Sequence, residues 1–215
     1  MKSTDTSEKG LEALIVQSLV SRAGYVRGRS EDYDRDHAMD LAQLQAFVSA
    51  TQRKTAEALR LGEDTPKRMQ FLHRLQGEIA RRGVVDALRS GVKDGPVEVA
   101  LFHGSPSAGN ERARELFAAN IFSVTRQLRY SKDETQLALD LGVFINGLPV
   151  ATFELKNRLT KQTVEDAVVQ YRRDRVGCVQ RRSEGIGVVH HRFQRQLHHH
   201  QGPAQVGQRD VHGDR

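Results

Sequence analysis

Residues 137–157 read LALDLGVFINGLPVATFELKN, and this stretch decides the fold class. Two apolar runs, residues 137–145 and 150–155, flank the dipeptide Asn146-Gly147. Asn-Gly between two strand-like runs is a strong signal for a tight hairpin, because both residues adopt positive φ at low cost. The stretch therefore predicts a pair of antiparallel strands.

The hairpin also carries charged residues where apolar ones are expected. Asp140 interrupts an apolar run, and Glu154 and Lys156 are two positions apart, so they share one face of a strand. Two converging carboxylates can bind Mg²⁺, and a nearby lysine can orient or deprotonate a water molecule. This arrangement is typical of a phosphodiesterase site.

Whether the two carboxylates converge depends on the hairpin register. A regular two-residue turn places Asp140 opposite Phe153, so that Asp140 and Glu154 point to opposite faces. A three-residue loop ending at Leu148, or a bulge, for example at Gly142, places Asp140 opposite Glu154 instead. We predict such an irregular register.

A simpler interpretation of these residues is also open, because the pattern is short enough to occur by chance. Asp140 could be a charge that protects an edge strand from aggregation. Glu154 and Lys156 could form a solvated ion pair that contributes little stability.

Outside the hairpin, the sequence favours helices first, then strands, then a helix. Thr65-Pro66 provides an N-cap and a proline at the first helical position. We expect helices over 11–23, 36–51, 65–82, 84–90, 110–120 and 163–173, strands over 97–101 and 120–130, and a loop over 24–33. This order predicts a mixed α/β fold, with a helical N-terminal part followed by a small mixed sheet flanked by helices.

The composition excludes several classes of protein. The chain has 215 residues, a net charge of +6, 38% hydrophobic residues and a single cysteine, Cys178. It contains no apolar run of 18 residues, no long apolar segment near its start and no set of cysteines. We therefore expect a cytoplasmic protein without a membrane-spanning helix, an internal disulfide or a cysteine-based zinc site. The positive charge is compatible with nucleic-acid binding but does not establish it.

The last part of the chain, residues 176–215, differs from the rest. It contains six of the nine histidines and several arginines but no lysine, and it has no sustained apolar period. Three explanations are open: a histidine-rich metal tract at 198–200, a disordered basic arm, or an out-of-frame translation, which we favour. Resequencing the gene would decide, because a clean single frame through codon 215 would contradict a frameshift.

Several segments together resemble the amino-terminal region of the R (restriction) subunit of type I restriction enzymes. The block FINGLPVATFELKN is the most specific of them. The segments are LEALI (11–15), DYD (32–34), FSVTRQL (122–128), FINGLPVATFELKN (144–157) and TVEDAVVQY (163–171). The resemblance implies a restriction-endonuclease-like domain of the PD-(D/E)xK type.

The resemblance also implies roles for individual residues. Asp140 and Glu154 correspond to the carboxylates that bind Mg²⁺, and Lys156 corresponds to the catalytic lysine. Gln170 resembles the family's glutamine on the following helix, and Glu12 matches the supporting acidic residue of the first helix. The alternative for Gln170 and Glu12 is that both are exposed polar residues on helices.

The same resemblance implies partners and parts beyond this chain. R subunits act on DNA together with modification and specificity subunits, and they continue into an ATP-driven translocase. No Gly-x-x-x-x-Gly-Lys-Ser/Thr loop is present, so ATP would be used only by a motor region absent from this chain. The family also implies a further core strand after the Gln170 helix. Because the family pattern is lost after Arg175, we expect the sheet edge there to be unpaired.

We therefore expect a disordered N-terminus over 1–10, a nuclease domain over 11–175 that is incomplete at its C-terminal end, and a disordered or out-of-frame tail over 176–215. Cleavage by the chain alone is expected to be weak or absent. The alternative function is a non-catalytic module that binds DNA or assembles with other subunits. Its DNA contacts would be basic side chains, namely Arg126, Arg129, Arg158 and Lys161.

Overall fold

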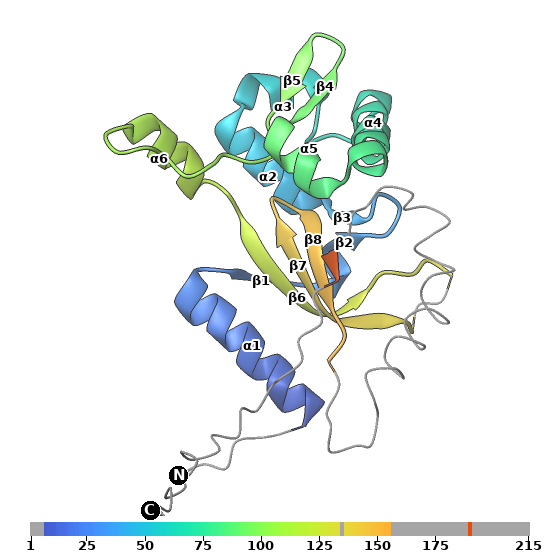
Figure 1. Cartoon of the computed structure of the whole chain (residues 1–215). Coiled ribbons are helices and arrows are strands. Elements are labelled where there is room, and N and C mark those ends of the chain that lie inside the picture. Colours follow the sequence, from blue (N-terminus) through green and yellow to red (C-terminus); the bar gives the residue numbers. More distant parts are fainter. Residues whose placement is uncertain (1–6, 134–135, 156–188, 191–215) are drawn as a thin grey trace, which may run out of the picture.

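The computed structural model describes residues 7–133, 136–155 and 189–190, which form a mixed α/β fold (Figure 1). The predicted fold class is confirmed. The main sheet has five strands in the order β1-β6-β7-β8-β9. Strands β6, β7 and β8 are antiparallel, while β1 runs parallel to β6 and β9 runs parallel to β8. The bounds are β1 Val26–Gly28, β6 Phe122–Arg129, β7 Ala138–Ile145, β8 Leu148–Phe153 and β9 Val189–His190.

The helices lie beside the sheet and at one end of it. Helix α1 lies along the sheet, α2 to α5 gather at the turn end of the β7–β8 hairpin, and α6 projects from the body (Figure 1). The helices are α1 Glu8–Ala23, α2 Leu41–Thr51, α3 Arg53–Leu59, α4 Pro66–Arg82, α5 Val84–Ser90 and α6 Glu111–Ala118. The shorter elements are η1 Ser30–Asp32, β2 Tyr33–Asp34, β3 Met39–Asp40, β4 Val92–Asp94 and β5 Val97–Val99.

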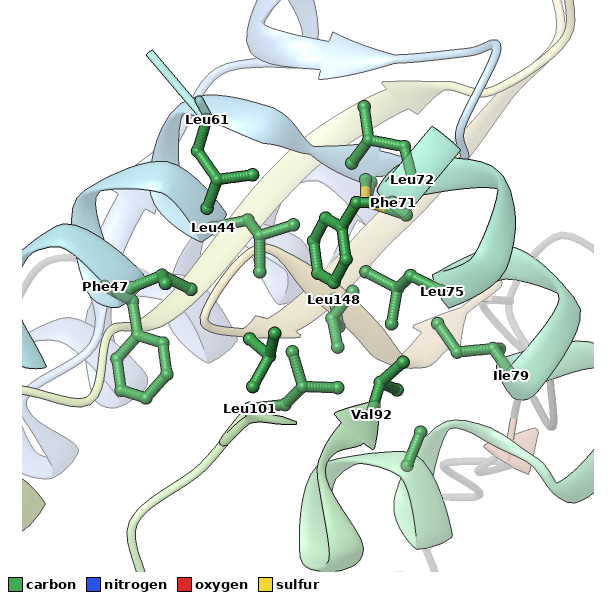
Figure 2. Close-up of a cluster of buried hydrophobic side chains, with 14 of the residues drawn as sticks. Leu44, Phe47, Leu61, Phe71, Leu72, Leu75, Ile79, Val92, Leu101 and Leu148 are labelled. Carbon is green, nitrogen blue, oxygen red and sulfur yellow. The ribbon is translucent and has the colours of Figure 1, made fainter. Parts of the chain in front are cut away.

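The β7–β8 hairpin joins two separate hydrophobic cores. At its turn, Leu148 is fully buried among side chains of the helical group, including Leu44 and Phe71 (Figure 2). Further along, Leu141 packs in a second cluster with Val16 of α1. Burying such side chains contributes about 1.5–3 kcal/mol each. The hairpin that carries the charged residues is therefore held rigidly from both sides.

Local signals fix the helix ends. The Ser7 hydroxyl accepts a hydrogen bond from the Gly10 N–H at 3.1 Å, so α1 begins at Glu8, earlier than the expected start at Leu11. Gly24 ends α1 with a φ of 73°. The predicted helices at 65–82 and 84–90 are confirmed as α4 and α5.

The N-cap of α4 allows a test of whether local hydrogen bonds fix the helix ends. The Thr65 hydroxyl accepts a hydrogen bond from the Arg68 N–H at 3.3 Å. We expect Thr65→Ala to lower the free energy of unfolding by about 1 kcal/mol, because one backbone N–H loses its partner. Urea denaturation followed by circular dichroism measures this loss, and Thr65→Ser should retain most of the stability. Equal stabilities for Thr65→Ala and the unsubstituted chain would contradict the cap.

The predicted loop over 24–33 is wrong, because residues 26–28 form strand β1. A side chain at Gly28 would place its Cβ 2.3 Å from Oγ1 of Thr125, so only glycine allows β1 to approach β6 this closely. The helix expected from residue 36 instead begins at Leu41, because the Asp40 carboxylate caps it through the Gln43 N–H at 3.0 Å. Burial raises the pKa of the Asp40 carboxyl, although its hydrogen bonds with Gln43 act in the opposite direction.

Strand β9 pairs with Ala151 and Thr152 of β8. The prediction of an unpaired sheet edge is therefore wrong at these two positions. None of the helices in the described residues is both long enough and apolar enough to span a membrane.

His103 makes stability depend on pH. It packs against Phe47, with ring centroids 5.5 Å apart, and its buried Nε2 makes no hydrogen bond. Burial, reinforced by the nearby Arg112 cation, lowers the pKa of His103. The folded state therefore binds fewer protons at this site than the unfolded state, so the free energy of unfolding should fall as the pH drops below about 6.5.

The change in unfolding free energy between pH 7.5 and 5.5, measured by urea denaturation, tests this. We expect a smaller change in His103→Gln than in the unsubstituted chain, because the group that resists protonation is gone. An unaltered pH dependence in His103→Gln would exclude His103 as its source.

Candidate functional site

The β7–β8 hairpin has the irregular register that the sequence predicts. Its turn has two residues, with Ile145 paired to Leu148, but the register shifts between Phe144 and Val143, whose partners are Pro149 and Ala151. Val150 is therefore the extra residue of a bulge on β8. The predicted bulge is confirmed, although it lies here and not at Gly142. Proline has no N–H to donate to the neighbouring strand, which favours a bulge beside it.

Beyond the bulge, the pairing of β7 with β8 ends one residue before the two carboxylates, at Leu141 and Phe153. The same register continued by one residue would set Glu154 opposite Asp140. The Leu155 N–H donates to Oδ2 of Asp140 at 2.6 Å. The segment that follows β8 therefore lies against the Asp140 carboxylate, as the predicted convergence requires.

Asp140 does not protect a sheet edge. It lies on β7, which is paired with β6 on one side and with β8 on the other. Its carboxylate is half-buried, and Oδ1 accepts a second hydrogen bond, from Nε2 of Gln127 at 3.3 Å. Asp140 itself lies one residue beyond the last pair of β7 with β8, Leu141 with Phe153. A partly buried carboxylate costs desolvation energy, which favours a functional interpretation.

Glu12 belongs to the same group of side chains. It lies on α1 with 2% of its surface exposed, so it is not the exposed helix residue of the alternative interpretation. Oε1 of Glu12 accepts a hydrogen bond from Nε of Arg126 at 2.5 Å, and Oε2 accepts one from Nε2 of Gln127 at 3.2 Å. A chain of hydrogen bonds therefore connects Glu12, through Gln127, to Asp140.

Sequence reasoning overlooked Gln127 as a site residue. The residue lies on β6 between Arg126, which pairs with Leu141, and Leu128, which pairs with Leu139. No local pattern distinguishes it, since its place beside Asp140 follows from the pairing of β6 with β7. Arg126 is one of the basic residues predicted to contact DNA in the alternative function. It forms an ion pair with Glu12, and its side chain is 44% exposed.

These oxygen donors suit a hard divalent cation. Each oxygen of the Asp140 carboxylate accepts one protein hydrogen bond given above, and a carboxylate oxygen can engage a further partner. In the described ranges, no three or more His, Cys, Asp or Glu side chains are grouped to hold a metal ion. Mg²⁺ commonly binds through one or two carboxylates and completes its shell with water and phosphate oxygens.

Several predicted site residues fall outside the described part of the chain. They are Lys156, Arg158, Lys161 and Gln170. The structure therefore brings together Asp140, the segment around Glu154, and Glu12, and it leaves the other assignments as predictions.

The fold and the site define a mixed α/β chain in which Asp140 of β7 and Glu12 of α1 are connected through Gln127. Residues 5–178 match the family described as type I restriction enzyme R protein N terminus (HSDR_N), and the chain belongs to this family. Neither the curated proteins nor the solved structures contain a match to the chain. The narrower prediction of a restriction-endonuclease-like fold therefore stays a prediction.

Proposed function

We propose that this chain is the magnesium-dependent DNA endonuclease domain of a type I restriction enzyme R subunit, acting in the cytoplasm. One observation carries the proposal: the bulged hairpin holds the Leu155 N–H 2.6 Å from the Asp140 carboxylate. This contact supports a position of Glu154 close to Asp140. Membership of the R protein family supplies the context in which two such carboxylates suggest a nuclease.

In this proposal, Asp140 and Glu154 hold Mg²⁺. The bound metal would supply a water molecule of lowered pKa and neutralise negative charge that develops on the scissile phosphate. The rigid hairpin contributes by fixing both carboxylates before DNA binds, so that little reorganisation is required during the reaction. Glu12 supports Asp140 through Gln127 without contacting the DNA.

The remaining roles follow the family pattern. Lys156 orients or deprotonates the attacking water, Gln170 lies near the scissile phosphate, and Arg158 and Lys161 contact the DNA backbone. Specificity and modification subunits would provide recognition of the target sequence. ATP would be used only by a motor region, because this chain has no phosphate-binding loop with a lysine.

The experiment that tests the proposal is a plasmid-nicking assay with the purified chain in excess over supercoiled DNA, so that slow cleavage is detected. We expect nicking that requires Mg²⁺, stops when a chelator removes the metal, and falls about 10²-fold or more in Lys156→Ala. The exposed Lys54 on α3 provides the matched control, and Lys54→Ala should cleave like the unsubstituted chain. Cleavage that survives Lys156→Ala would exclude this site.

A further inference from the structure

Gln127 has an unusual backbone conformation for a residue inside a strand. Its φ is +46°, in the left-handed region that side chains other than glycine and asparagine seldom adopt. The other non-glycine residues with positive φ in the described ranges lie in turns or at a helix end, at Ala38, Arg60 and Asn146. Strain of about 1–3 kcal/mol at such a position persists only where the surroundings enforce it.

The left-handed conformation changes which face of the sheet the neighbouring side chains occupy. Before it, Val124 packs in the cluster with α1, and Arg126 reaches Glu12 on the same helix. After it, Leu128 packs instead with Phe144 and its neighbours in a different cluster. Gln127 is thus the residue at which β6 turns from one face to the other.

This turn brings the Gln127 amide to the acidic group. Its Nε2 donates to Oε2 of Glu12 at 3.2 Å and to Oδ1 of Asp140 at 3.3 Å. An amide nitrogen carries two hydrogens, so one group can satisfy both carboxylates at once. A donor shared by the two carboxylates restricts the rotation of each side chain.

We infer that Gln127 is a positioning residue that orients Asp140 for metal binding and couples it to the buried Glu12. The inference rests on the proposed function, because it assumes that Asp140 binds Mg²⁺. Groups that hold a metal ligand from behind typically change metal affinity by about 10–100-fold when they are removed. The left-handed backbone conformation of Gln127 is strained, but it points the amide toward Glu12 and Asp140.

Substitution by glycine separates the amide from the backbone strain. Gln127→Gly removes the donor, yet glycine adopts positive φ freely, so thermal stability should be unchanged or higher. We expect Mn²⁺, used as a spectroscopic substitute for Mg²⁺ in electron paramagnetic resonance titrations, to bind the purified chain about 10-fold more weakly in this variant. Gln127→Asn keeps an amide and tolerates this conformation but is one methylene too short to bridge both carboxylates, so its affinity should be intermediate.

Ala38→Gly is the matched control, because Ala38 also has a positive φ, of 56°, but lies in the β2–β3 turn. It should relieve strain and leave Mn²⁺ affinity as it is. Unchanged Mn²⁺ affinity in Gln127→Gly would overturn the inference. A weaker affinity accompanied by a lower melting temperature would overturn it too, because it would indicate a purely structural role. If the unsubstituted chain binds no Mn²⁺, or if Asp140→Asn binds it equally well, the proposed function itself fails.

Discussion

Asp140→Asn is expected to lower magnesium-dependent DNA cleavage by about 10²–10³-fold, the scale on which removal of one pre-organised electrostatic group acts. The substitution keeps the shape of the side chain, and its carbonyl oxygen can still accept the Leu155 N–H. It removes the negative charge that attracts the cation. It also sets an amide in place of the carboxylate beside Nε2 of Gln127, which donates to Oδ1 of Asp140 at 3.3 Å. The loss should therefore appear mainly in activity and metal affinity, with a smaller loss of stability from the two amide nitrogens that then face each other.

Single-turnover nicking of supercoiled plasmid, with protein in excess, measures this effect. Asp86→Asn is the matched control, since Asp86 is an exposed residue of α5 in an ion pair with Arg82. It should leave cleavage unchanged, because an exposed ion pair contributes little. Retention of most of the activity in Asp140→Asn would refute the assignment of Asp140 as a metal ligand.

Asn146→Ala is expected to lower the free energy of unfolding by about 3 kcal/mol or more. The Asn146 side chain is fully buried at the hairpin turn. Its Nδ2 donates to the Leu101 carbonyl at 2.8 Å and to Oδ1 of Asn120 at 3.0 Å, and its Oδ1 accepts the Ile121 N–H at 2.7 Å. Alanine would leave all three partners without this side chain in a buried environment. It would also have to adopt the φ of 51° that asparagine tolerates better.

The consequence reaches the proposed metal site as well as the stability of the fold. The turn that Asn146 forms is packed against α2, where the Asp40 N–H donates to the Gly147 carbonyl at 2.8 Å. A Cβ at Gly147 would lie 2.2 Å from the Asp40 carbonyl oxygen, so the turn has no room to shift. Loosening it would disturb the bulged register of β7 and β8 and the contact of the Leu155 N–H with Asp140.

Equilibrium urea denaturation, followed by circular dichroism, measures the effect of Asn146→Ala. Asn110→Ala is the comparison, because Asn110 is an exposed N-cap of α6 whose Oδ1 accepts the Ala113 N–H at 2.9 Å. That variant should lose only about 1 kcal/mol. Similar losses in the two variants would show that the buried hydrogen bonds of Asn146 do not hold the turn in place.

Features encoded by local sequence could be predicted. Helix α4 begins and ends at the predicted residues because Thr65, Pro66 and Gly83 mark its ends by short-range chemistry. The Asn146-Gly147 turn followed for the same reason. The bulge was also predictable. A regular register would place Asp140 and Glu154 on opposite faces, whereas the proposed metal site requires them on one face.

Features that depend on non-local pairing could not be predicted. Strand β1 is short and polar, and only its contact with β6, permitted by Gly28, makes it a strand. The role of Gln127 depends on the pairing of β6 with β7 and on the position of α1. No short-range pattern in residues 122–128 indicates a positive φ at Gln127. The bulge lies at Val150, beside Pro149, a position that the missing N–H of proline explains only once the pairing partner is known.

The central claim is that Asp140 and Glu154 hold one divalent cation between them. A crystal structure of the chain grown with Mn²⁺ tests it most directly, because the anomalous signal locates the metal without reference to activity. We expect an anomalous peak about 2.0–2.3 Å from a carboxylate oxygen of each residue, and no such peak in Asp140→Asn crystals. A peak bound elsewhere, or none at this pair under saturating Mn²⁺, would contradict the claim.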